Sequence, residues 1–132
     1  KMTKEELFEN FSYFSDWEEK YTYLIELGNN LPPFDEKDKT EENKIHGCMS
    51  QVWFTHEKKN GLNYFNATSD ALIVKGLEAV LILLINEKTD EEISNLNIHQ
   101  IFEDLGLKDH LSPTRRNGFY AMTERIFSLI KK

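Results

Sequence analysis

The sequence predicts a single α+β domain built around one buried helix. Residues 69–85 carry an almost unbroken series of aliphatic side chains, which is typical of a helix covered on most sides. Residues 44–68 are rich in β-branched and aromatic side chains, and Asn60-Gly61 within them is a strong signal for a tight hairpin turn. No glycine- or proline-rich linker divides the 132 residues, so we expect one compact domain over residues 1–132.

Two short helices are expected before the sheet. Thr3 with Glu6, and Asp16 with Glu19, have the spacing of N-terminal helix caps. Apolar residues follow each pair at intervals of three or four, which is the helical period. Gly28 then stands where a glycine commonly follows the end of a helix, and two prolines come shortly after it.

Three antiparallel strands are expected in the middle of the chain. The candidate strands are residues 44–46, 51–56 and 62–68, and the last two are joined by the Asn-Gly turn. Residues 47–50 form a turn of mostly small residues between the first two strands. The economical arrangement is a three-stranded meander packed against the central buried helix, with N- and C-terminal helices flanking it.

The second half of the chain is expected to be helical. The long apolar helix runs to about Ile85, and its ~1.5 Å rise per residue lets it span a small domain. A short helix over residues 101–105 is closed by Gly106, and the last helix carries apolar residues to Ile130. The helix starts are marked by capping residues, namely Ser69 or Asp70, Thr89, and Ser112 before Pro113.

The overall composition argues against several classes of protein. The formal net charge of −7 disfavours binding to nucleic acid, whose phosphates repel such a chain. The longest apolar run, residues 79–85, falls short of the ~18 residues that suggest a membrane span. The chain has one cysteine and no secretory signal pattern at its N-terminus, so we expect a cytoplasmic protein without disulfides.

Cys48 is the first candidate for chemistry because it lies in the short turn directly after Gly47. A side chain in a turn is more accessible to a partner than one in the middle of a strand. The glycine before it lets the backbone bend sharply. A thiolate is a strong nucleophile, although an unperturbed thiol is mostly protonated at neutral pH. The sequence alone leaves open the alternative that Cys48 is a buried, unreactive small hydrophobe, which is common for free cysteine.

Other combinations of polar residues give weaker signals. A zinc site needs about four ligands, and one cysteine with the scattered histidines His46, His56, His99 and His110 fits that poorly. A Cys–His hydrolase pair has no supporting motif. Arg115 and its neighbour Arg116 begin the last helix, where they are either solvated or serve a partner's carboxylate or a thiolate.

Four segments of the sequence resemble the SufE family, the sulfur acceptors that work with cysteine desulfurases. The resemblance runs from about residue 4 to residue 130, with the motifs in the family's order and the only cysteine inside one of them. The segments are Trp17-Glu18-Glu19-Lys20-Tyr21 with Ile25-Glu26-Leu27-Gly28, Ile45-His46-Gly47-Cys48-Met49-Ser50-Gln51-Val52-Trp53, Ser69-Asp70 with Ile73-Val74-Lys75-Gly76-Leu77, and His110-Leu111-Ser112-Pro113-Thr114-Arg115 with Gly118.

The resemblance implies a specific role for Cys48. It matches the cysteine that takes persulfide sulfur from a pyridoxal-phosphate-dependent, SufS-type cysteine desulfurase, stimulates desulfuration of L-cysteine, and carries sulfur toward an iron–sulfur cluster scaffold. The resemblance also implies a three-stranded sheet, and it makes Gly47, Ser50, Asp70 and Arg115 candidates for supporting the loop or docking the partner. No cofactor or metal of its own is implied, nor is stand-alone enzyme activity.

Several alternatives stay open from the sequence. An adaptor that activates the desulfurase allosterically would not need the thiol, and a redox sensor would oxidise at Cys48 instead. A cluster scaffold would need about three thiolate or equivalent ligands, and this chain has one cysteine. The identity of the desulfurase, the final sulfur acceptor and the presence of a homodimer are not determined by the sequence.

Overall fold

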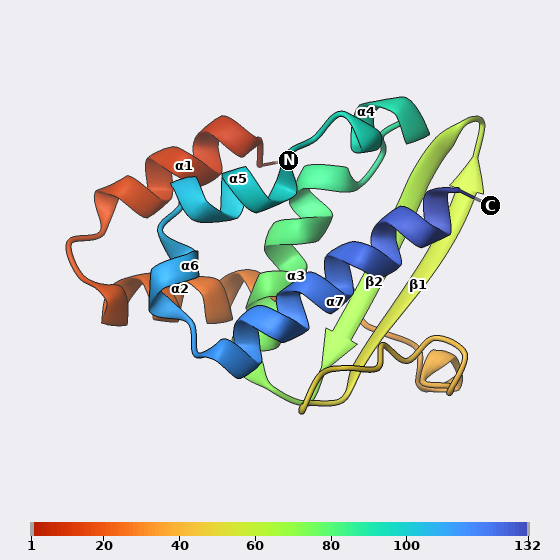
Figure 1. The fold of residues 1–132 in the computed structure, drawn as a ribbon, viewed down its shortest axis with the longest axis horizontal. Coiled ribbons are helices and arrows are strands. Elements are labelled where there is room, and N and C mark those ends of the chain that lie inside the picture. The colour runs from red at the N-terminus through yellow and green to blue at the C-terminus, as the bar shows by residue number, and fades with distance from the viewer. Residues whose placement is uncertain (1, 132) are drawn as a thin grey trace.

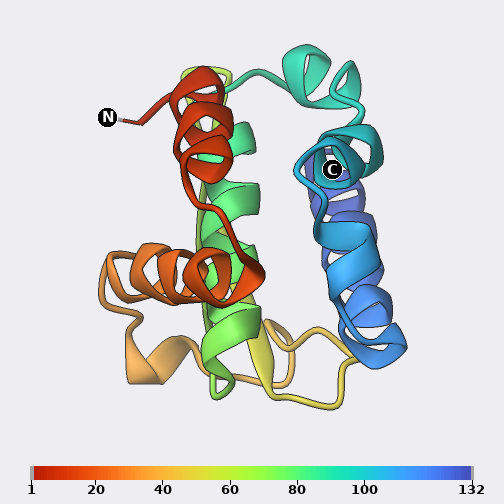
Figure 2. The same ribbon diagram turned by 90° about the vertical axis from the view of Figure 1, so that its left-hand side faces the viewer.

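Helix α3 (Leu72–Ile85) runs through the centre of the protein in a computed structural model, which describes residues 2–131 (Figures 1 and 2). Most of its residues are buried, and it packs against α2, β2 and α7. The predicted α+β class and the central buried helix are therefore confirmed. In chain order the other elements are α1 (Lys4–Tyr13), α2 (Trp17–Asn29), the 3-10 helix η1 (Glu36–Asp38), β1 (Val52–Lys59), β2 (Leu62–Ser69), α4 (Asp90–Ser94), α5 (Ile98–Asp104), α6 (Leu107–His110) and α7 (Pro113–Ile130).

The sheet has two strands in the described part of the chain, and the expected third strand is wrong. Strands β1 and β2 form an antiparallel hairpin in which Val52 pairs with Ser69. Residues 44–46 contribute only an isolated bridge between Lys44 and Trp53. A turn lies immediately before Lys44 and a bend immediately after residue 45, so the chain does not stay extended long enough to build a ladder.

Two glycines bring α2 and α3 into close contact. A Cβ atom on Gly76 would lie 2.4 Å from the backbone oxygen of Leu24, and one on Gly28 would lie 2.8 Å from the backbone nitrogen of Gly76. The expectation that Gly28 follows the end of a helix is wrong, because α2 continues to Asn29. Gly28 is needed for the close helix crossing, in which neither backbone leaves room for a side chain.

Most predicted caps are formed, with one exception at the start of α3. The side chains of Thr3, Asp16, Thr89 and Ser112 each accept a backbone hydrogen bond in the first turn of their helices. The residue before α3 is instead Ala71, which makes no side-chain cap. Ser69 Oγ accepts from the Ala71 backbone nitrogen, while Asp70 turns toward another segment, so neither residue caps the helix.

Helices pack against α3 from two sides. Helices α5, α6 and α7 form a column beside α3, and α2 crosses α3 on the other side (Figure 2). The loop between η1 and β1 runs along the end of the molecule where α3 and α7 begin (Figures 1 and 2). No helix among residues 2–131 is long and apolar enough to cross a membrane.

The glycine contact predicts that Gly76→Ala destabilises the protein. Alanine is the better helix former, but its methyl group would have to displace the α2 backbone at Leu24. We expect overpacking to dominate and to lower the free energy of unfolding by about 1–3 kcal/mol. Chemical denaturation measures this, with Leu72→Ala on the exposed start of α3 as the control. A Gly76→Ala protein as stable as wild type would contradict the close crossing.

Candidate functional site

Cys48 lies half-buried in the loop that connects the Lys44 bridge to β1. Its Sγ atom is 3.8 Å from the backbone oxygen of Gly118 on α7, which is a weak thiol hydrogen bond in which sulfur donates. A Cβ atom on Gly118 would lie 3.5 Å from this sulfur, so the glycine allows the loop to lie close to the helix. The thiol therefore rests against the body of the protein and does not project into solvent.

A small cavity adjoins the sulfur. Its volume is about 30 Å³, about twice what one water molecule requires. Most of its wall comes from α3 and α7 and is apolar, so the space beside the sulfur is poorly hydrated. The lining residues are Cys48, Met49, Ser50, Val74, Leu77, Thr114, Arg115, Gly118, Phe119 and Met122.

Side chains from other segments bind the backbone of the loop at both of its ends. Gly47 adopts φ +92°, a left-handed conformation that favours glycine. Asp70 Oδ1 accepts a hydrogen bond of 3.0 Å from the Gln51 backbone nitrogen, just after the turn. On the other side, Arg125 Nη2 donates to the backbone oxygen of Lys44 at 2.6 Å. The loop is therefore tied to the start of α3 and to α7 while its tip carries few contacts.

The structure places the other predicted site residues around the same loop. Ser50 and Arg115 line the cavity beside Cys48, and Gly47 directly precedes the cysteine. The Arg115 side chain is otherwise exposed, and its backbone nitrogen donates to Ser112 Oγ. Asp70 does not line the cavity and contacts the loop through Gln51.

Glu78 was missed by the sequence reasoning. It lies in the middle of α3, its exposed fraction is 0 %, and neither carboxyl oxygen has a hydrogen-bond partner. Burial raises the pKa of Glu78 to about 9, and the nearby Lys75 ammonium opposes that rise only in part. The available signal was the acid itself, because a carboxyl within so apolar a helix is costly unless it is neutral.

The surroundings of Cys48 keep its thiol protonated. Burial raises its pKa above the ordinary value, and Glu78 raises it further when its carboxyl is ionised. Ionisation would also remove the S–H donor that faces the Gly118 carbonyl. The thiol in this position is therefore a poor nucleophile, since the thiolate is the reactive form.

The candidate histidines lie away from this cavity. His46 pairs with Glu41 on the surface, and His110 stacks on Trp17 with ring centroids 3.8 Å apart. His99 packs against aromatic rings of α7. None of the histidines lines the cavity beside Cys48, so the structure assembles no Cys–His pair there. Within residues 2–131 no group of three or more potential metal ligands occurs.

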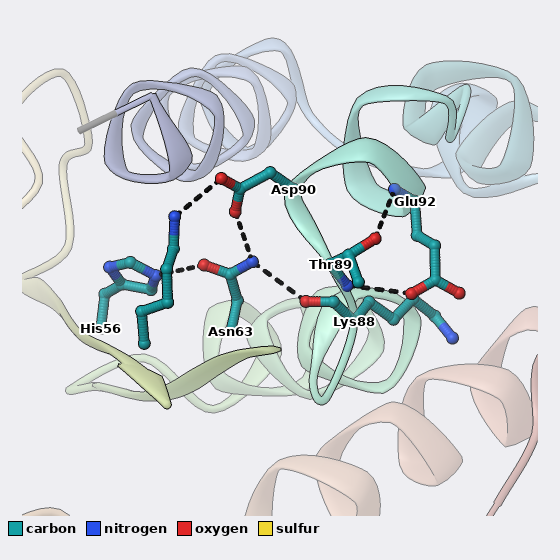
Figure 3. A network of polar contacts seen from close by, with 7 residues as sticks. His56, Asn63, Lys88, Thr89, Asp90 and Glu92 are labelled. Atoms are coloured by element: carbon teal, nitrogen blue, oxygen red, sulfur yellow. Dashed lines mark hydrogen bonds and ion pairs between the residues drawn. The ribbon is translucent and has the colours of Figure 1, made fainter. Parts of the chain in front are cut away.

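His56 instead belongs to a polar network near the hairpin turn (Figure 3). The fully buried Asn63 donates from Nδ2 to the Lys88 backbone oxygen at 3.0 Å and to Asp90 Oδ1 at 2.8 Å. Its Oδ1 must therefore accept from His56 Nε2, 2.7 Å away, so that nitrogen carries a proton. Lys58 completes the network at 2.7 Å from Asp90. The network ties the hairpin to α4 and has no contact with the cysteine loop.

The comparison with protein families accounts for nearly the whole chain. The family described as SufE, Fe-S metabolism associated domain, matches residues 5–130, which include the cysteine loop and both helices of the cavity. The chain belongs to the SufE family. The resemblance found in the four sequence segments is thereby confirmed, and the SufE domain associates this protein with iron–sulfur metabolism.

A solved structure shows the same fold as this SufE-family chain. It is the solution structure of a hypothetical protein from Thermus thermophilus, with a TM-score of 0.79. The alignment covers 98% of this chain and 96% of that chain, at 18% sequence identity. At this identity the likeness concerns the fold alone.

Glu78 predicts an unusual dependence of stability on pH. The unfolded chain releases the Glu78 proton near the ordinary pKa of 4.5, whereas the folded protein keeps it until about 9. Between these values unfolding releases a proton, so the free energy of unfolding falls as pH rises, by at most about 1.4 kcal/mol per pH unit. We expect Glu78→Gln to flatten this slope between pH 6 and 8, measured by chemical denaturation. The exposed Glu103→Gln is the control, and parallel slopes would contradict the assignment.

The Asp70–Gln51 contact predicts that Asp70→Ala loosens the cysteine loop. Losing this hydrogen bond costs about 1 kcal/mol of local stability, so an open form becomes about five times more populated. We expect Cys48 to be alkylated by iodoacetamide correspondingly faster, with Asp70→Asn, which keeps an acceptor, closer to wild type. Equal rates for all three proteins would show that this contact does not restrain the loop.

Proposed function

We propose that this protein accepts persulfide sulfur on Cys48 from a pyridoxal-phosphate-dependent cysteine desulfurase, stimulates that enzyme, and delivers sulfur for iron–sulfur cluster assembly. The observation that carries the proposal is the position of the only cysteine of a SufE-family chain. It lies in a loop tip beside a cavity, not in the core or in a metal cluster. The pyridoxal phosphate belongs to the desulfurase and not to this chain.

The chemistry requires only thiol exchange. The Cys48 thiolate attacks the outer sulfur of the desulfurase persulfide, a new S–S bond forms at Cys48, and the old S–S bond breaks. The desulfurase cysteine leaves as a thiolate and takes up a proton equivalent to the one that Cys48 lost. No oxidant or reductant is consumed, so a carrier with a single cysteine is sufficient.

The resting position of Cys48 supports a transfer that needs movement of the loop. Against α7 the thiol is shielded and protonated, which limits both oxidation and exchange. When the loop leaves the body, the sulfur regains hydration and the thiolate becomes accessible. The cavity of about 30 Å³ also gives a loaded Cys48 room for roughly one additional sulfur atom on its return.

The surface next to the cysteine offers contacts for the desulfurase. Met49 is 86 % exposed directly beside Cys48, and Leu72 at the start of α3 is 57 % exposed. Large apolar side chains exposed next to a reactive group are typical of binding surfaces. In this proposal Gly47 and Asp70 control the loop, while Ser50 and Arg115 at the cavity rim contact the partner or the transferred sulfur. A scaffold protein for iron–sulfur clusters is the downstream acceptor.

Mass spectrometry of the protein after incubation with a cysteine desulfurase and L-cysteine tests the proposal. We expect an addition of about 32 Da, one sulfur atom, on the wild-type chain and none on Cys48→Ala. The Ala variant should fold normally and should also fail to stimulate alanine production. Stimulation that survives in Cys48→Ala would instead identify an allosteric adaptor, and absence of the added sulfur from wild type would reject the carrier role.

A further inference from the structure

Glu78 has no structural role that explains its position. Its carboxyl group is fully buried, and neither oxygen has a hydrogen-bond partner within residues 2–131. A leucine at this place in an apolar helix would bury its side chain without having to desolvate an acid. A buried acid without a partner reduces stability, so stability does not explain why a glutamate occupies position 78. An effect of its carboxyl on a neighbouring group would explain it.

Cys48 is the reactive group on which the charge of Glu78 acts. Glu78 follows Val74 by four residues and Leu77 by one, and both of these line the cavity beside the sulfur. In an α-helix, residues four apart lie on the same face, one turn from each other. Glu78 therefore lies one turn beyond Val74 and directly after Leu77 of the cavity wall, and its charge acts on the Cys48 thiol through a poorly hydrated interior.

Few other charges face this pair. Lys75, one turn before Glu78 on α3, is the cation that acts on its carboxyl, and Arg115 lies at the rim of the cavity. The elements packed against α3 present no buried titratable side chain, as their buried residues show. Those residues are Leu24 and Gly28 of α2, Asn63, Phe65, Ala67 and Thr68 of β2, and Gly118, Phe119, Met122, Thr123, Ile126 and Ile130 of α7.

We propose that Glu78 and the sulfur at position 48 form a buried acid pair that holds at most one negative charge while the loop is retracted. Two anions in a low-dielectric interior repel strongly, and the part of the chain that the structure describes has no buried cation to separate these two. Glu78 therefore keeps its proton whenever the retracted sulfur is anionic. It is a positioning residue that acts through the ionisation of the sulfur.

The pair gives the carrier a specific property in the sulfur-loaded state, and this part rests on the proposed function. The terminal S–H of a persulfide is more acidic than that of a thiol. In the retracted loop the persulfide is therefore the ionised member of the pair, and Glu78 stays neutral. A neutral Glu78 permits this, whereas an ionised carboxylate would expel the anion toward solvent or the partner. The persulfide releases its S–H proton to solvent while Glu78 keeps its own, and no co-reactant is needed.

The pH dependence of thiolate formation at Cys48 in the free protein tests the pair. The ultraviolet absorbance of the thiolate, after subtraction of the Cys48→Ala spectrum, reports the ionised fraction of Cys48 without any reagent that needs an open loop. At pH 7 Glu78 is protonated in wild type, and we expect equal thiolate fractions in wild type and Glu78→Gln. At pH 9 about half of Glu78 is ionised and suppresses the thiolate, so the thiolate fraction of Glu78→Gln should be about twofold larger, with a wider ratio at pH 10.

The profile also separates this role from a structural one. If Glu78→Gln only loosened the loop, the thiolate fraction would increase by the same factor at every pH below the pKa of Cys48, and the proposal would be overturned. Profiles that coincide from pH 7 to pH 10 would overturn it as well. Glu103→Gln, which removes an exposed charge from α5, is the control for net charge and should match wild type. No desulfurase is present, so the result is independent of whether sulfur is accepted in the mass assay.

Discussion

The burial of α3 is the constraint on which the rest of the structure depends. A helix that is apolar on almost all sides has to be covered on almost all sides, and α2, β2 and α7 share this task. The close approach at Gly28 and Gly76 brings α2 against the helix, and the hairpin covers another face. Helix α7 is left to cover the remaining face, and its start meets the start of α3 where the cysteine loop lies.

This packing determines the chemistry of the sulfur. Cys48 lies against α7, so the low hydration of the interior holds the thiol in its protonated form. A carrier benefits from such a resting state, because a protonated, shielded thiol exchanges slowly with other thiols and oxidants. Reactivity then depends on a movement of a short loop, and its tip has few contacts to break.

Glu78 is the only ionisable side chain among the buried residues of α3. Every other buried residue of α3 is apolar or glycine, and the carboxyl has no partner among the described residues. Natural sequences usually violate local consistency at sites where function requires it. Here the inconsistent residue is Glu78, which directly follows Leu77 of the cavity wall. The stability that is lost by burying its carboxyl is therefore coupled to the ionisation of the Cys48 sulfur.

The sequence by itself determined most of the helices and their N-terminal caps, the hairpin at Asn60-Gly61 and the identity of the candidate nucleophile. These features depend on residues close together in the chain, where periodicity and turn chemistry act directly. Only the tertiary structure decided that residues 44–46 form a bridge and not a strand, that Asp70 holds the loop and does not cap α3, and that Glu78 acts on Cys48. These relations join residues about 10 to 30 positions apart, and their geometry depends on how α3 is covered, which no local pattern encodes.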